Sequence, residues 1–132
     1  MPRHHFRLLG RYISIGALSV ENTLLDLGAN INLIPLAMLK KIGDLEVHPT
    51  KMQLQLADRS IKYPYGAVED VLVKMDKFIF PMDFVVMDIK EDGEVPLILG
   101  RPFMKIVRII VDVDKGELQL RPQEEEVTFN LF

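Results

Sequence analysis

The sequence predicts a mostly β protein made of one domain, with one or two short helices. Short runs of alternating apolar and polar residues recur along the chain and are separated by glycine, proline and polar turn residues. The chain has 132 residues, which is enough for one domain with a core of its own. Hydrophobic residues make up 48% of the chain and charged residues 27%, which is the balance of an ordinary globular protein.

The first expected elements are a hairpin and a short helix. Residues 11–25 alternate apolar and polar side chains on both sides of Gly16, which suits a tight connection between two strands. Residues 35–43 predict a helix, because Pro35 is favoured in a first helical turn and Gly43 is favoured at a helix end.

The middle of the chain predicts two further hairpins. Residues 50–66 alternate strongly, turn at a polar tip at 58–60 and return, and residues 68–89 do the same around a turn at 75–77. A polar loop at 90–94 follows the second hairpin. The aromatic side chains that we expect in the core are Phe78, Phe80, Phe84 and Phe103.

The last third of the chain begins with a continuous apolar run and ends in strands. Residues 95–100 form this run, which ends in glycine, and residues 101–107 suit a short second helix that begins near a proline. Residues 108–120 predict a hairpin that turns at 114–116, and residues 126–132 predict a last strand.

Charge and composition exclude some classes of function. The net charge of −3 argues against nucleic acid or an anionic membrane as the main partner. No apolar run reaches the roughly 18 residues that are needed to span a bilayer, and residues 1–10 do not resemble a secretory signal, so we expect a cytoplasmic protein. Cysteine is absent, and a metal site would depend on His4, His5 and His48, which are a poor ligand set; we therefore expect no metal and no cofactor.

One acidic residue lies where the sequence otherwise indicates core. Asp26 is surrounded by apolar residues in NTLLDLGANINLIP, residues 22–35. An ionised carboxylate is costly to bury without partners, so Asp26 is a turn residue, a helix N-cap or a functional residue. Gly28 favours the turn, because glycine adopts positive φ without steric cost.

Four segments in a fixed order carry a family resemblance, which favours the interpretation of Asp26 as a functional residue. They are DLGA at 26–29, LQLADRSIKYP at 54–64, DKFIFP at 76–81 and LILGRPF at 97–103. In this order they resemble the retropepsins, the aspartic proteases of retroviruses and LTR retrotransposons, with the nearest likeness to gypsy-type elements of plants. The resemblance covers residues 11–132 and leaves residues 1–10 as an N-terminal extension or leader.

The resemblance implies a closed β-barrel of the acid-protease type, with its active site at the interface of a homodimer. It implies that Asp26 is catalytic, that the hairpin at 50–66 is a flap over a bound peptide, and that the strand at 127–132 helps to hold two subunits together. The implied site residues are Leu27, Gly28, Ala29 and Asn30 in the active-site loop, Ala57, Asp58, Arg59, Ser60 and Ile61 in the flap, and Leu97, Ile98, Leu99, Gly100 and Arg101 as support for the substrate pocket.

The implied activity is that of an aspartic endopeptidase. Two carboxylates share one proton in this chemistry: one activates water and the other protonates the scissile carbonyl. This chain supplies one matching aspartate, so two chains would each contribute Asp26, and acid is expected to favour activity. The implied substrate is the polyprotein from which such a domain is released, cut in extended segments in the cytoplasm or within retroelement particles.

Two positions depart from the retropepsin pattern. Leu27 stands where active members usually carry a serine or threonine whose hydroxyl bonds across the dimer axis; leucine cannot make this bond, although it can pack against its symmetry mate. Asn30 stands where many members carry an aspartate that pairs with the arginine found here at Arg101. The alternative function is therefore a catalytically weak or inactive module of this fold that dimerises or binds peptides. A small barrel that binds an apolar ligand is a third possibility, which explains the composition but not the ordered segments.

Overall fold

The computed structural model describes the chain in six stretches. Backbone and side chains are described for most of residues 12–107, and only the course of the backbone is described for residues 5–11 and for three strands near the C-terminal end. The described stretches are 5–55, 59–89, 96–107, 109–112, 117–120 and 127–130.

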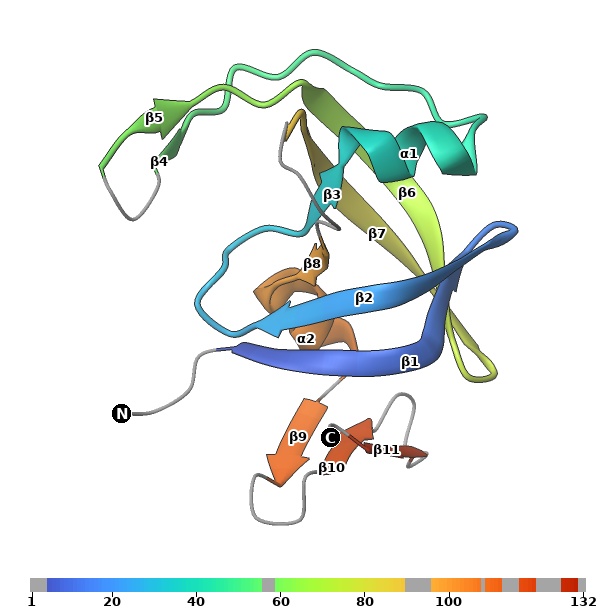
Figure 1. The fold of residues 1–132 in the computed structure, drawn as a ribbon. Helices are drawn as coiled ribbons and strands as arrows, with labels where there is room; N and C mark the ends of the chain where they lie inside the picture. Colours follow the sequence, from blue (N-terminus) through green and yellow to red (C-terminus); the bar gives the residue numbers. More distant parts are fainter. Residues whose placement is uncertain are drawn as a thin grey trace.

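Six strands close into a barrel, with two short helices beside it (Figure 1). The order around the barrel is β1-β2-β8-β3-β7-β6, so that segments far apart in the chain become neighbours. The barrel strands are β1 (His5–Ile15), β2 (Leu18–Asp26), β3 (Leu33–Pro35), β6 (Gly66–Met75), β7 (Phe78–Met87) and β8 (Leu97–Leu99), and the helices are α1 (Leu36–Ile42) and α2 (Arg101–Val107).

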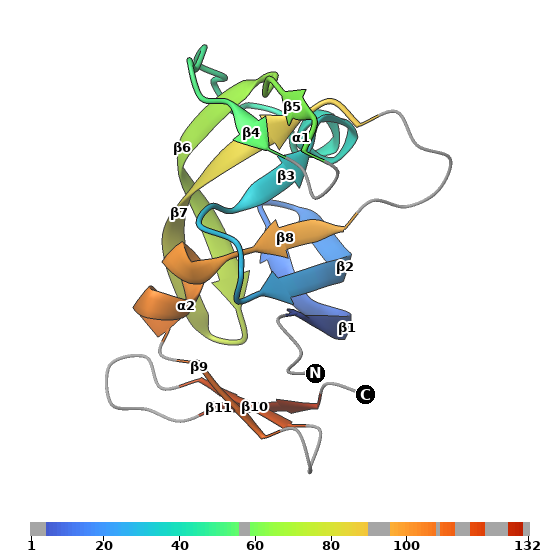
Figure 2. The same cartoon turned by 90° about the vertical axis from the view of Figure 1, so that its left-hand side faces the viewer.

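Two smaller sheets lie outside the barrel. A two-stranded hairpin projects from one end, and a three-stranded antiparallel sheet of order β11-β10-β9 lies beyond β1 at the opposite end, as both views show (Figure 1, Figure 2). Their strands are β4 (Leu54–Gln55), β5 (Ile61–Lys62), β9 (Ile109–Asp112), β10 (Glu117–Leu120) and β11 (Val127–Asn130).

Turn residues fix the two long hairpins of the barrel. Gly16 has a φ of 59° between β1 and β2, and Asp76 has a φ of 55° between β6 and β7. Glycine, and to a lesser degree aspartate, adopts this left-handed conformation at small cost. The short helix α1 ends as its sequence predicts, because the N–H of Gly43 donates to the carbonyl oxygen of Leu39 at 3.1 Å.

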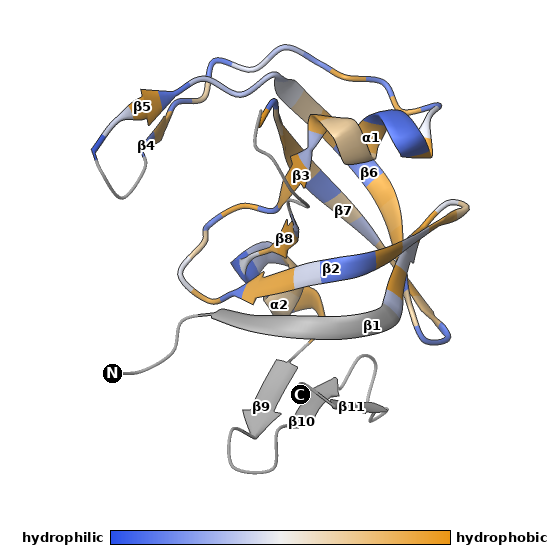
Figure 3. Ribbon diagram, in the orientation of Figure 1, coloured by the Kyte–Doolittle hydropathy of each residue, from blue (hydrophilic) through white to orange (hydrophobic). Residues whose placement is uncertain are grey.

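The core fills the barrel with side chains from all six strands and from α2. Figure 3 shows hydrophobic residues along β8 and along the part of β2 that leads to Asp26. Phe80 and Phe103 meet edge to face, with ring centroids 6.2 Å apart, and Phe84 is also buried, whereas Phe78 is only half-buried. The largest fully buried side chains are Phe84, Phe103, Ile13, Ile15, Leu25, Ile34, Met75, Leu97 and Leu99.

The structure confirms the predicted class, since a closed barrel of strands is accompanied by two short helices. The strand β1 begins at His5, within residues 1–10, and its residues 5–9 pair with residues 22–26 of β2. The expected loop at 90–94, the expected turn at 114–116, and residues 126, 131 and 132 of the expected terminal strand lie outside the described residues.

Candidate active site

Asp26 is the last residue of β2 and begins the loop that leads to β3. Its side chain is half-buried, and its Oδ1 accepts a hydrogen bond from the N–H of Gly28 at 2.9 Å. The N–H of Ala29 donates to the carbonyl oxygen of Asp26 at 3.2 Å, which closes a tight turn. Asp26 is therefore a turn residue in this fold, and the same turn fixes the position of its carboxylate at the end of an apolar strand.

The strand β8 lies directly beside β2 and supports the loop. The two strands run parallel, with Leu24 opposite Ile98 and Leu25 opposite Leu99. Leu97 and Leu99 are fully buried, and Ile98 is half-buried and also pairs with Leu33 of β3. The apolar segments LLD and LIL, which the sequence places about half a domain apart, thus meet as neighbouring strands beneath the loop.

Gly100 allows the close approach of β8 to this loop. A Cβ at Gly100 would lie 2.3 Å from the carbonyl oxygen of Ile31 and 2.8 Å from that of Ala29, which is closer than side-chain atoms approach in proteins. The next residue, Arg101, donates its backbone N–H to the carbonyl oxygen of Ala29 at 2.9 Å. The predicted support residues therefore hold the loop through buried side chains and through backbone contacts.

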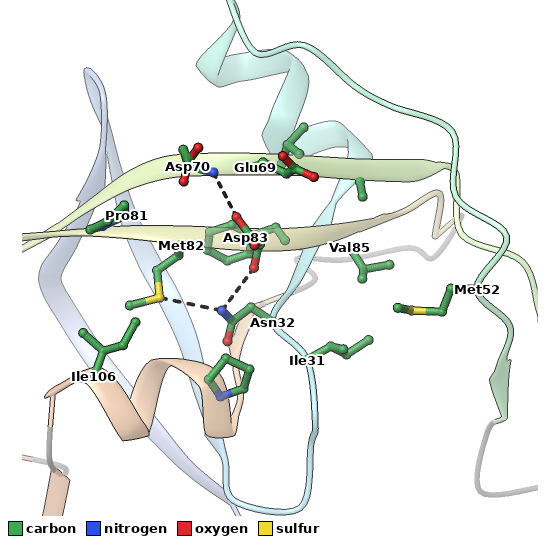
Figure 4. Close-up of a pocket in the computed structure, with 14 residues that line it drawn as sticks. Ile31, Asn32, Met52, Glu69, Asp70, Pro81, Met82, Asp83, Val85 and Ile106 are labelled. Atoms are coloured by element: carbon green, nitrogen blue, oxygen red, sulfur yellow. Dashed lines mark hydrogen bonds between the residues drawn. The ribbon is translucent and has the colours of Figure 1, made fainter.

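Asn32 holds the same loop from inside the protein, and the sequence analysis did not identify it. Its side chain is 2% exposed; its Oδ1 accepts the N–H of Gly100 at 2.8 Å, and its Nδ2 donates to the carbonyl oxygen of Asp83 at 3.2 Å (Figure 4). These contacts join the loop, the end of β8 and β7. A polar residue between Ile31 and Leu33 was the available signal, because a buried amide needs hydrogen-bond partners.

The two positions that depart from the retropepsin pattern both lie at the surface of this chain. Leu27 is 39% exposed at the tip of the loop, where a large apolar side chain gains nothing from water. Asn30 is exposed, as is the side chain of Arg101, which meets the loop through its backbone N–H. The loop thus presents an apolar tip beside the carboxylate of Asp26.

The predicted flap corresponds to the hairpin of β4 and β5, where Leu54 pairs with Lys62 and Gln55 pairs with Ile61. The hairpin projects from the barrel on the side of the loop that follows β2 (Figure 1). Large side chains on and beside it are exposed, with Ile61 at 55% and Tyr63 at 70%. Of the predicted tip, Arg59 and Ser60 are exposed, and Ala57 and Asp58 lie outside the described residues.

Neither a membrane-spanning helix nor a metal cluster occurs in the part of the chain that the structure describes. None of its helices is both long and apolar enough to cross a bilayer. Its histidine and acidic side chains nowhere gather in a group of three that could hold a metal ion.

Comparison with known proteins identifies the fold. No protein-family model matches the chain, and no curated protein matches it in sequence. Among solved structures, the chain is similar to the crystal structure of the retroviral protease-like domain of Ddi1 from Leishmania major, with a TM-score of 0.68 and 15% sequence identity. The match covers 99% of this chain and 96% of that one. The closed barrel with its two short helices is thus a retropepsin-like fold, which confirms the fold that the resemblance implied.

Proposed function

We propose that this protein is an aspartic endopeptidase of the retropepsin type. One observation carries the proposal: Asp26 lies in a turn at the end of an apolar strand, over β8, within a retropepsin-like barrel. A carboxylate held in such a turn can act on a substrate, because the N–H of Gly28 fixes its orientation before a substrate binds.

The proposed site is completed by a second chain. Amide hydrolysis by carboxylates uses one ionised group to take a proton from water and one protonated group to donate a proton to the scissile carbonyl. Two carboxylates about 3 Å apart share one proton between them, since like charges at that distance do not both ionise. Each chain contributes Asp26, and the exposed Leu27 beside it meets its symmetry mate across the dimer axis.

The proposed substrate is a polypeptide in an extended conformation. The hairpin of β4 and β5 closes over the bound peptide and excludes water, and its exposed Ile61 and Tyr63 offer apolar contacts. We further propose that the domain derives from a gypsy-type retrotransposon and cleaves its own polyprotein in the cytoplasm or in retroelement particles. The ordered segments DLGA, LQLADRSIKYP, DKFIFP and LILGRPF support this origin.

Cleavage of a mixed peptide library between about pH 4 and 7 tests the proposed activity, with Asp26→Asn as the matched control. Asparagine keeps an oxygen that accepts the N–H of Gly28, so the control preserves the turn and removes the acid. We expect cleavage that is favoured by acid and lost in Asp26→Asn. Activity that survives in Asp26→Asn would exclude Asp26 as the catalytic residue.

Leu27 supports a second candidate function, a module of the same fold that dimerises or binds peptides without cleaving them. A leucine provides apolar burial at the tip of the loop and no hydroxyl to lock two loops together. This candidate predicts a folded dimer that binds extended peptides and leaves the whole library intact. The library experiment therefore separates the two functions.

A further inference from the structure

A groove opens on the outside of the barrel, between the β6–β7 hairpin and the helix α2. Its volume is about 420 Å³, which is in the range of sites that bind small ligands or individual side chains. Figure 4 shows Ile106 of α2 facing Pro81 and Met82 of β7, with Ile31 and Met52 at the other end. The floor of the groove is therefore apolar.

The groove is separate from the candidate catalytic turn. None of its described lining residues comes from residues 26–30. Its walls are strands β6 and β7, the helix α2, Met52, and the last two residues of the loop that leads from Asp26 to β3, Ile31 and Asn32. Asn32 lies between the two sites, because it binds Gly100 beneath the loop and Asp83 beside the groove. A ligand in the groove would contact no atom of Asp26.

Three carboxylates line the edge of the groove, and no described lysine, arginine or histidine lines it. They are Glu69, Asp70 and Asp83, and all three side chains are exposed. The pairing of β6 with β7 shifts register between Val68 and Val71, which places Glu69 and Asp70 together on the outer face of the strand. Asp83 accepts the backbone N–H of Asp70 at 3.0 Å, which ties the bulge to β7 (Figure 4).

We propose that this groove binds a peptide segment that carries a lysine or arginine side chain. Such side chains combine an apolar stem with a cationic end, and they lie along apolar surfaces while the charge stays in a polar environment. In this groove the stem packs against Pro81, Met82 and Ile106, and the cationic end lies among Glu69, Asp70 and Asp83. The apolar floor of the groove is thus complementary to the stem of such a side chain, and the acidic edge is complementary to its cationic end.

Exposed apolar residues beside the groove indicate a peptide rather than an isolated cation. Pro81, which lines the groove, pairs with Leu72 of β6, and Leu72 and Ile79 are each 58% exposed on the outer face of this hairpin. Bulky apolar residues that flank the cation in a peptide would cover them. Lys74 is exposed opposite Ile79, farther along the hairpin. Its positive charge repels the cation of the peptide, which is therefore directed to the end of the groove that holds Asp70 and Asp83.

Binding of a defined peptide tests this inference independently of the proposed enzyme activity, because the full chain is used with Asp26→Asn in every sample. The probe is a fluorescein-labelled peptide with one arginine between two pairs of leucines, measured by fluorescence anisotropy. The groove variant is Glu69→Gln, Asp70→Asn and Asp83→Asn, in which residue 83 keeps an oxygen for the N–H of residue 70. Its matched control removes the same charge from exposed acids outside the groove: Asp44→Asn, Asp76→Asn and Asp88→Asn.

We expect saturable binding that the groove variant weakens about tenfold, the sum of two or three exposed ion pairs, while the control variant changes it by less than about twofold. The same peptide with citrulline in place of arginine should bind the unaltered groove about tenfold more weakly, since citrulline keeps the shape and removes the charge. Equal weakening by both variants, or no saturable binding to the folded protein, would overturn the inference. If hexylammonium competes for the groove as strongly as the peptide does, the ligand is a small cation and the inference is overturned. If the groove variant loses self-association, the groove binds a second copy of this chain, and the inference is likewise overturned.

Discussion

At the scale of single residues, the central feature is a carboxylate that has been placed by its own turn. Asp26 binds the N–H of Gly28, and Ala29 closes the turn onto the backbone of Asp26. The neighbouring side chain, Leu27, points its apolar surface outward at 39% exposure. In the dimer that we propose, this surface would be buried against its symmetry mate, so Leu27 would contribute to association through apolar burial and would make no hydrogen bond across the axis.

Replacing Leu27 should therefore change the affinity between the two chains, and the change should depend on whether the new side chain carries a hydroxyl. We expect Leu27→Thr to strengthen dimerisation by about 1 kcal/mol for each new hydrogen bond across the axis, and to raise peptidase activity. Sedimentation equilibrium measures the affinity. The matched control is Leu27→Val, which has the shape of threonine without its hydroxyl. Equal dimer affinities for the threonine and valine variants would contradict this account of the loop.

At the scale of elements, local sequence signals identify most strands and both helices. Gly16 marks the first hairpin and Gly43 marks the end of α1, because each has the positive φ that glycine favours. The strand β3 has only three residues, which is too short for alternation to be visible in the sequence. Asn32 was missed for another reason: its partners Gly100 and Asp83 are 68 and 51 residues away in the chain, so its role depends on the closed barrel.

The contacts of Asn32 predict a large effect of its removal on stability. We expect Asn32→Ala to lower the free energy of unfolding by about 1–3 kcal/mol, because the buried N–H of Gly100 and the carbonyl of Asp83 lose their partner. Urea denaturation measures the change. The control is Asn30→Ala, which removes the same side chain from an exposed position in the same loop and should cost less than about 0.5 kcal/mol. Similar losses in the two variants would show that the bridge from Asn32 contributes nothing to stability.

At the scale of the whole molecule, the ordered segments of the sequence predicted a fold that the structure and its full-length similarity to a retroviral protease-like domain confirm. The groove beside α2 was not predicted, since its lining combines β6, β7, α2 and two separate loops. The barrel places one Asp26 at the end of β2 in each chain. The proposed chemistry needs two such carboxylates, so the functional unit that we propose is a dimer of this chain.

Mixing active and inactive chains tests most directly whether each active site contains Asp26 from two chains. The protein and its Asp26→Asn variant are unfolded together in urea, refolded in known proportions, and assayed for peptide cleavage at constant total concentration. If every site contains Asp26 from two chains, an equal mixture forms about one quarter of its dimers from two active chains and retains about one quarter of the activity. Retention of about one half, in proportion to the active chain alone, would mean that each chain cleaves independently and would contradict the dimeric site.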